Sequence, residues 1–201
     1  MENRLNTDDG DRWEYLQDYT ENLKKIYKVS TIEGFWQVFN NIPTPNNLHP
    51  RYSFHLMRGD RRPIWEDPLN ENGGYWKLKC HKNNTELVWR ELVLAAIGEQ
   101  FRGCLKDNVS DNIVGVSVSI RDRDDHFQIW NENWEGAQGA TIVEKVTKEL
   151  LPKMKFHSTF YKEHKNHHKF EKNVSNKMLN GGGFGGGGGR KNKNNKNKNG
   201  G

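Results

Sequence analysis

The run of residues 114–130, "VGVSVSIRDRDDHFQIW", constrains the fold more than any other part of the chain. Apolar and polar residues alternate on both sides of the acidic pair Asp124 and Asp125, a pattern typical of two antiparallel strands with one buried face. If these two aspartates form a two-residue hairpin turn, the resulting register pairs Arg123 with His126, Arg121 with Gln128, and Ser119 with Trp130.

The alternation gives the predicted sheet two chemically different faces. One face collects apolar side chains that helices can cover, namely Val116, Val118, Ile120, Phe127 and Ile129. The other face presents two guanidiniums, an imidazole and an indole, from Arg121, Arg123, His126 and Trp130. Such a face also occurs merely for solubility, but the chain has seven tryptophans, more than one small core needs. Cations interleaved with aromatic rings indicate nucleotide binding.

Helical and strand patterns elsewhere predict an α+β fold with helices on one face of a sheet. Ser30 and Glu33 have capping-box spacing before a helix over residues 31–41, and Thr85 can cap a second helix that reaches Phe101. A third helix covers residues 142–150. Strands are expected at residues 52–58, 75–80, 113–120, 126–130 and 156–161.

Length and charge predict one domain with two tails. The chain has 201 residues and a net charge of +5. Residues 1–22 hold seven acidic residues against two arginines and form a weakly ordered acidic segment, whereas the Gly/Asn/Lys-rich residues 173–201 form a basic tail expected to be disordered. The domain is therefore expected over residues 23–172. With two cysteines, no signal peptide and no apolar run of membrane-spanning length, a cytoplasmic protein is expected, with the nucleus also open.

The segment "RPIWEDP", residues 62–68, places an indole beside two carboxylates where a strand cannot continue. The ring of Trp65 can stack on a purine, and Glu66 can then accept two N–H bonds from the Watson–Crick edge of guanine. A guanine alkylated at N7 carries positive charge, which strengthens both contacts. Arg121 and Arg123 would lie where a phosphate chain could run.

At these residues the sequence resembles the eukaryotic translation initiation factor 4E family, which binds the 7-methylguanosine cap of messenger RNA. The resemblance covers residues 23–172 and rests on five ordered blocks: "TIEGFWQVFNNI", "YSFHLMRGDRRPIWEDPLNENGGYWKLK", "VWRELVLAAIGEQF", "GVSVSIRDRDDHFQIWN" and "FYKEHKNHHKF". The segments "LMRGDRRP", "GVSVSIRDR" and "YKEHKNHH" look most like the type 3 branch of the family. The resemblance implies a strongly curved antiparallel sheet with three helices on its convex face and a cap-binding slot on its concave side.

The resemblance also implies roles for single residues. Trp65 matches the second stacking tryptophan, Glu66 the carboxylate that reads guanine, and Trp130 the tryptophan beside the N7 methyl group. Arg121 matches the phosphate-binding arginine. His126 stands where well-known members have a phosphate-binding lysine, and Arg123, predicted to lie opposite, could compensate.

The first stacking position falls on Tyr19 by spacing, with Trp13 and Tyr15 as alternatives in the same segment. No clear His-Pro-Leu…Trp strand precedes it, so the first strand of the family is degraded, shortened or absent.

A second surface is implied for scaffold factors similar to initiation factor 4G, or for 4E-binding proteins, that carry a Tyr-x4-Leu-hydrophobic motif. Ile32 and Trp36 match this surface on the first helix, and Glu91 and Leu94 match it on the second. Arg90 replaces a leucine of well-known members, which could favour different partners. Periodicity alone also allows Trp36 to be a core residue.

The favoured function is cap binding in translation initiation, by a protein that is a monomer outside its complex. Two alternatives stay open: a cap-occupying repressor with poor scaffold binding, and a general single-stranded RNA-binding protein. No enzyme, cofactor or membrane association is predicted, because the chain has no phosphate-loop motif and no nucleophile with an orienting base. A metal site at His164, His167 and His168 lacks accompanying ligands.

Overall fold

The computed structural model describes residues 22–165, which fall into two compact units that divide between Thr44 and Pro45 and are described separately. In the first unit, helix α2 (Ile32–Phe39) begins after Thr31, whose Oγ1 accepts a hydrogen bond from the backbone N–H of Gly34 at 3.0 Å. The predicted capping box of Ser30 and Glu33 is therefore wrong. The hydroxyl one residue later in the chain satisfies the free N–H group instead.

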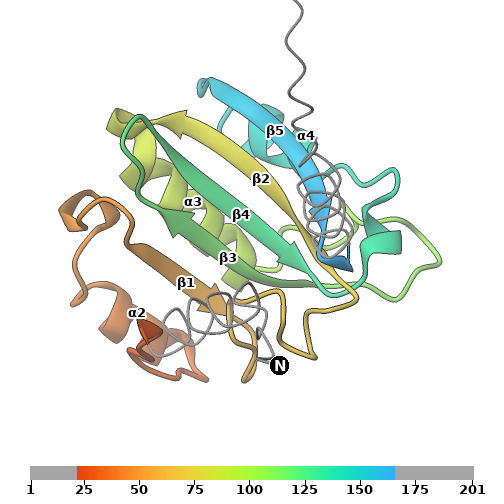
Figure 1. Ribbon diagram of the computed structural model, residues 1–201, viewed down its shortest axis with the longest axis horizontal. Helices are drawn as coiled ribbons and strands as arrows, with labels where there is room; N and C mark the ends of the chain where they lie inside the picture. Colours follow the sequence, from red (N-terminus) through yellow and green to blue (C-terminus); the bar gives the residue numbers. More distant parts are fainter. Residues whose placement is uncertain (1–21, 166–201) are drawn as a thin grey trace, which may run out of the picture. The chain divides into compact units, whose positions relative to one another are not determined.

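The second unit is built on a curved five-stranded sheet (Figure 1). Its strands are β1 (Ser53–Met57), β2 (Gly74–His81), β3 (Ile113–Ser119), β4 (Asp124–Asn131) and β5 (Phe156–Glu163). They lie in the order β1-β3-β4-β2-β5, and every neighbouring pair is antiparallel. β4 thus has β3 on one side and β2 on the other.

The β3–β4 register differs from the predicted one. Ser119 lies opposite His126, and Ser117 lies opposite Gln128, so these two β4 residues meet partners four positions earlier than expected. Asp124 and Asp125 belong to β4 rather than to a turn, because the side chain of Asp125 is buried and bonded to the segment that precedes and begins helix α3. The displacement is even, so the predicted division into two faces holds.

Helices cover the apolar face of the sheet. α3 (Thr85–Ile97) contacts β3, and α4 (Ile142–Glu144) continues as the π-helical η4 (Lys145–Leu150); both α3 and α4 lie behind the sheet in Figure 1. Short 3-10 turns occur at η1 (Pro45–Asn47), η2 (Lys82–Asn84) and η3 (Trp134–Ala137). The buried residues of this layer include Leu78, Val88, Leu92, Val116, Val118, Phe127, Ile129, Ile142 and Val146.

The α+β architecture with an antiparallel sheet and three helices is confirmed, although two details of α3 differ. Asn84 is its N-cap residue, and the Thr85 hydroxyl binds Asp125 instead of capping the helix. The helix ends at Ile97, not at Phe101: Gly98 is its C-cap residue, and Glu99 then takes the left-handed conformation with a φ of 53°. None of the helices within residues 22–165 is long and apolar enough to cross a membrane. The domain limits at residues 22 and 172 stay predictions, since the acidic segment before Asn22 and the basic tail lie outside the described residues.

Candidate functional site

Trp65 and Glu66 lie in the loop between β1 and β2, which side chains on either side of them hold in shape. The buried carboxylate of Asp67 accepts hydrogen bonds from the backbone N–H of Arg62 at 3.2 Å and from that of Leu69 at 2.9 Å. Asn70, also buried, donates through Nδ2 to the carbonyls of Arg62 and Ile64 at 2.7 and 2.8 Å. The half-buried indole and carboxylate therefore sit on a loop closed by its own hydrogen bonds.

The negative charge of Asp67 strengthens the hydrogen bonds that close this loop. Burial acts to raise the pKa of Asp67, but the hydrogen bonds from Leu69 and Arg62 and the charge of the Arg62 guanidinium outweigh it, and the pKa is lowered. Asp67 is therefore a carboxylate at neutral pH and can keep both backbone N–H groups bound.

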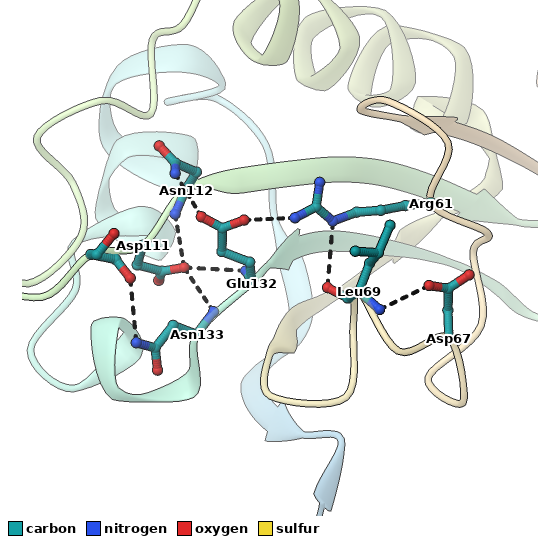
Figure 2. Close-up of polar contacts among 8 residues, drawn as sticks. Arg61, Asp67, Leu69, Asp111, Asn112, Glu132 and Asn133 are labelled. Carbon is teal, nitrogen blue, oxygen red and sulfur yellow. Dashed lines mark hydrogen bonds and ion pairs between the residues drawn. The ribbon is translucent and has the colours of Figure 1, made fainter.

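Arg61 ties the same loop to the end of β4 (Figure 2). Its guanidinium donates to Glu132 Oε2 at 2.7 Å, and its Nε reaches the carbonyl of Leu69 at 3.5 Å. Glu132 is held in turn by Asn112, which donates to its other oxygen at 2.7 Å, and by Asp111, which accepts from its backbone N–H at 3.2 Å. The loop that carries Trp65 is thus fixed two residues from Trp130.

Trp130 is held rigidly on the polar face of β4. Its indole Nε1–H donates to Ser117 Oγ at 3.0 Å, and Ser117 shares a second hydrogen bond of 2.7 Å with His55 Nδ1. Its ring also lies 5.5 Å from that of Tyr75 and 5.1 Å from that of His164. Trp130 is only 4% exposed, so at most an edge of the ring can meet a ligand.

His55 completes this chain of hydrogen bonds as a neutral imidazole. Burial lowers the pKa of His55 from 6.5 to about 4. Because the indole of Trp130 can only donate, Ser117 accepts from it and is left with one proton to offer to a neutral His55. The three side chains come from adjacent strands, β1, β3 and β4.

Arg121 lies at the start of the turn between β3 and β4, half-buried and well supported. Its backbone N–H donates to Asp125 Oδ1 at 2.9 Å. The same carboxylate accepts from Thr85 Oγ1 at 2.6 Å and from Lys82 Nζ at 3.0 Å. The register places Arg123 in the turn, where it is exposed, and not opposite His126 as expected. The predicted compensation for His126 through strand pairing is therefore wrong.

His126 lies near Lys77 and Lys79, two cations that were not among the predicted site residues. Burial, followed by the charges of Lys77, Lys79 and Arg121, lowers the pKa of His126 from 6.5 to about 4, and Asp125 opposes this only in part. Lys77 and Lys79 alternate with buried residues along β2, in "YWKLKC". The two lysines are two positions apart in "WKLK", and in a strand this spacing indicates that their side chains lie on the same face.

The residues matched to a partner surface are distributed over both units. On α2, Ile32 is 72% exposed and Trp36 is 37% exposed, whereas the neighbouring Phe35 is buried. Trp36 is therefore no fully buried core residue. On α3, Glu91 and Leu94 are partly buried, and Glu91 lies 3.5 Å from the guanidinium of Arg90.

Several expected positions lie outside the described residues: Tyr19 with its alternatives Trp13 and Tyr15, and the histidines His167 and His168. Between residues 22 and 165 no group of three or more His, Cys, Asp or Glu side chains is arranged to hold a metal ion. His164 is buried against the rings of Tyr75 and Trp130.

Comparison with solved structures supports the fold. The chain is similar to Caenorhabditis elegans eIF4E-3, solved in complex with the 4E-binding protein Mextli and cap analog, with 26% identity and a TM-score of 0.64. The match covers 75% of this chain and 84% of that chain. A second structure of eIF4E-3 with Mextli matches equally well, with a TM-score of 0.64.

Comparison with known sequences identifies the family. The chain is 33% identical over 151 residues to eukaryotic translation initiation factor NCBP of Triticum aestivum, covering 75% of this chain and 61% of the wheat protein. It is 35% identical to eukaryotic translation initiation factor 4E-1 of Zea mays, over 64% of this chain and 56% of the maize protein. The chain thus spans about three fifths of the length of these relatives. The family model "Eukaryotic initiation factor 4E" matches residues 4–179, and the chain belongs to this family.

Proposed function

We propose that this protein binds the 7-methylguanosine cap of messenger RNA and takes part in translation initiation by recruiting capped messenger RNA through scaffold partners. The observation that carries the proposal is the anchored loop of Trp65 and Glu66, which Arg61 fixes to Glu132, two residues after Trp130. The solved relative with a cap analog supports it. The protein acts by binding and not by catalysis, and its place of action is the cytoplasm.

In the proposed site, different residues bind the methylated base and the phosphates. Trp65 stacks on the methylated guanine, whose positive charge strengthens the contact with the ring. Glu66 accepts two N–H bonds from the guanine edge, which adenine cannot offer. Trp130, held in place by Ser117, contacts the N7 methyl group with its exposed edge. Tyr19 supplies the second ring of the sandwich.

The triphosphate runs toward the turn between β3 and β4. Arg121 is the main phosphate ligand, because its backbone is fixed by Asp125 and a guanidinium can donate two parallel hydrogen bonds to one phosphate. His126 is neutral in the free protein and offers one N–H donor. Arg123, exposed in the turn, adds long-range attraction that salt weakens.

A second class of ligand is proposed for the helices. Ile32 and Trp36 on α2, and Glu91 and Leu94 on α3, are proposed to bind scaffold factors similar to initiation factor 4G or 4E-binding proteins with a Tyr-x4-Leu-hydrophobic motif. The complex of eIF4E-3 with a 4E-binding protein supports partners of this kind. Outside such a complex we propose a monomer.

One observation favours the alternative of a cap-occupying repressor. Arg90 lies 3.5 Å from Glu91 on α3, so a cation stands beside a carboxylate proposed to contact the partner. Arg90 would weaken the binding of scaffold proteins whose motif requires an apolar contact at that point.

Capture on immobilised 7-methylguanosine triphosphate tests both functions. The protein should be retained, released by free 7-methylguanosine triphosphate, and not released by the same concentration of GTP. Release by GTP would contradict cap recognition and favour general RNA binding. Scaffold proteins among those captured with it support recruitment, and capture of the protein without scaffold proteins supports the repressor.

A further inference from the structure

Lysines of β2 form a row on the sheet face that carries Trp130 and His126. Lys77 lies opposite Gln128 of β4, and Lys79 lies opposite His126. Residues directly opposite each other in an antiparallel pair project to the same face. On the other side of β2, Lys162 of β5 lies opposite Tyr75, which places a third ammonium group on that face.

The row brings Lys77, Lys79 and Lys162 together on one face of the sheet. Burial, followed by the charges of Lys79, Arg121 and Lys162, lowers the pKa of Lys77, so these cations lie within electrostatic reach of one another. Among residues 22–165 neither Lys77 nor Lys79 forms an ion pair. Of the acids at this end of the sheet, Asp124 contacts His157 at 3.0 Å and also lies within electrostatic reach of Lys79, and Asp125 contacts Lys82 at 3.0 Å.

Solubility alone does not account for the two β2 lysines. Both lysines are half-buried, and burial lowers the pKa of the Lys77 ammonium group, so this group is partly removed from water. Like charges held close together in partial burial cost free energy, and a bound polyanion would offset that cost.

We propose that Lys77 and Lys79 form a second phosphate site that binds the RNA chain following the cap. The inference rests on the proposed function, which assigns the cap triphosphate to Arg121 and His126. Lys79 is the neighbour of His126 on the adjacent strand, at a strand spacing of about 4.8 Å. Lys77 follows two residues along β2, about 7 Å further. A chain that leaves His126 and crosses to β2 therefore meets both ammonium groups in succession.

The test compares ligands that share the methylated base and differ in the phosphates and nucleotides attached to it. The affinities of 7-methylguanosine monophosphate, 7-methylguanosine triphosphate and a short capped oligoadenylate are measured by calorimetry for the wild type and for Lys77→Gln/Lys79→Gln. The matched control is Lys148→Gln/Lys153→Gln, which removes the same charge at exposed positions in and after η4. Lys77→Arg/Lys79→Arg keeps the charge and the approximate size of the side chains.

The Lys77→Gln/Lys79→Gln variant should bind 7-methylguanosine monophosphate like the wild type but lose about tenfold in affinity for the capped oligonucleotide. Its slope of log affinity against log salt for that ligand should decrease by about 1.4, since each single-strand phosphate contact contributes about 0.7. The arginine variant and the control should behave like the wild type.

Two outcomes would overturn the inference. One is that the Lys77→Gln/Lys79→Gln variant keeps the wild-type ratio of affinities for the capped oligonucleotide and for 7-methylguanosine triphosphate. The other is an equal loss for both ligands, which would assign the lysines to the cap triphosphate alone. If the wild type fails to bind 7-methylguanosine monophosphate, the proposed function itself fails, and the two failures are thereby distinguishable.

Discussion

Arg61 and Glu132 form an ion pair of 2.7 Å that joins the loop of Trp65 and Glu66 to the residue following β4. Both side chains are largely shielded, with exposed fractions of 17% and 28%. Neither is proposed to touch the cap. Substituting either residue should therefore alter the geometry of the site without removing a group proposed to contact the cap.

Breaking this pair should weaken cap binding indirectly. Arg61→Ala releases the loop from Glu132 and from the Leu69 carbonyl, and the affinity for 7-methylguanosine triphosphate should fall about tenfold because the loop must be ordered on binding. Calorimetry measures the affinity. Arg58→Ala is the control, since Arg58 pairs with Glu99 at the surface, where ion pairs contribute little. Equal effects of the two variants would show that Arg61 does not position the site.

Removing the carboxylate proposed to read guanine should have a larger effect. Glu66→Ala takes away two charge-assisted hydrogen bonds, on the order of 3 kcal/mol or more of binding free energy. Glu71→Ala, at an exposed position of the same loop, is the matched control and should bind as the wild type does. An affinity of the Glu66→Ala variant within about twofold of the wild type would contradict the assigned role.

Ser117 provides a test of how Trp130 is held. Ser117→Ala removes the acceptor of the buried indole N–H and the partner of His55, and should lower the free energy of unfolding by about 1 to 3 kcal/mol. Urea unfolding gives this value. Ser53→Ala, which breaks the bond to Ser119 on the same face, leaves only one hydroxyl unpaired, whereas Ser117→Ala leaves both the indole N–H and the imidazole unpaired, so Ser53→Ala should cost less. The reverse order of the two costs would argue that the Ser117 hydroxyl does not hold the indole.

The two faces of the sheet could be predicted from sequence, but the register could not. Alternation with a period of two survives any even displacement, so Val118 and Phe127 fall on the buried face in both the predicted and the observed pairing. The register depended on interpreting Asp124 and Asp125 as turn residues. Asp125 instead bonds to Thr85, 40 residues away in the chain, and local sequence carries no sign of that contact.

The candidate site, too, could be predicted from sequence only in part. Trp65 and Glu66 stand out in sequence, because an indole between prolines beside a carboxylate is unusual in a loop and matches a family motif. The groups that support the site do not stand out. His55 and Ser117 are 62 residues apart and meet only because β1 pairs with β3, a pairing that joins strands separated by β2 in the chain.

Acid should destabilise the protein through His55. Burial lowers the pKa of His55 to about 4, below its ordinary value of 6.5. Between these two pH values His55 is protonated in the unfolded chain and neutral in the folded protein. The free energy of unfolding should therefore fall as the pH drops below about 6.5, by about 2 kcal/mol at about pH 5 from this residue. Urea unfolding at several pH values checks this. His55→Gln should remove its share of the decrease and leave the share due to His126, whose pKa is also lowered to about 4. His49→Gln, at an exposed position, should leave the decrease unchanged.

Arg121 and Arg123 should differ as phosphate ligands, although the sequence presents them as a pair. The Arg121 backbone is fixed by Asp125, and its side chain is half-buried beside His126, while Arg123 is exposed in the turn. Arg121→Glu should therefore lower the affinity for 7-methylguanosine triphosphate on the order of a hundredfold, and should change little the affinity for the cap nucleoside 7-methylguanosine, which has no phosphates. Arg123→Glu should cost only about threefold, and added salt should remove most of that difference, because an exposed charge acts through solvent. Fluorescence quenching titrations of both variants with both ligands give the four affinities. Equal losses for nucleoside and triphosphate in the Arg121 variant would mean that the phosphates take another path across the sheet.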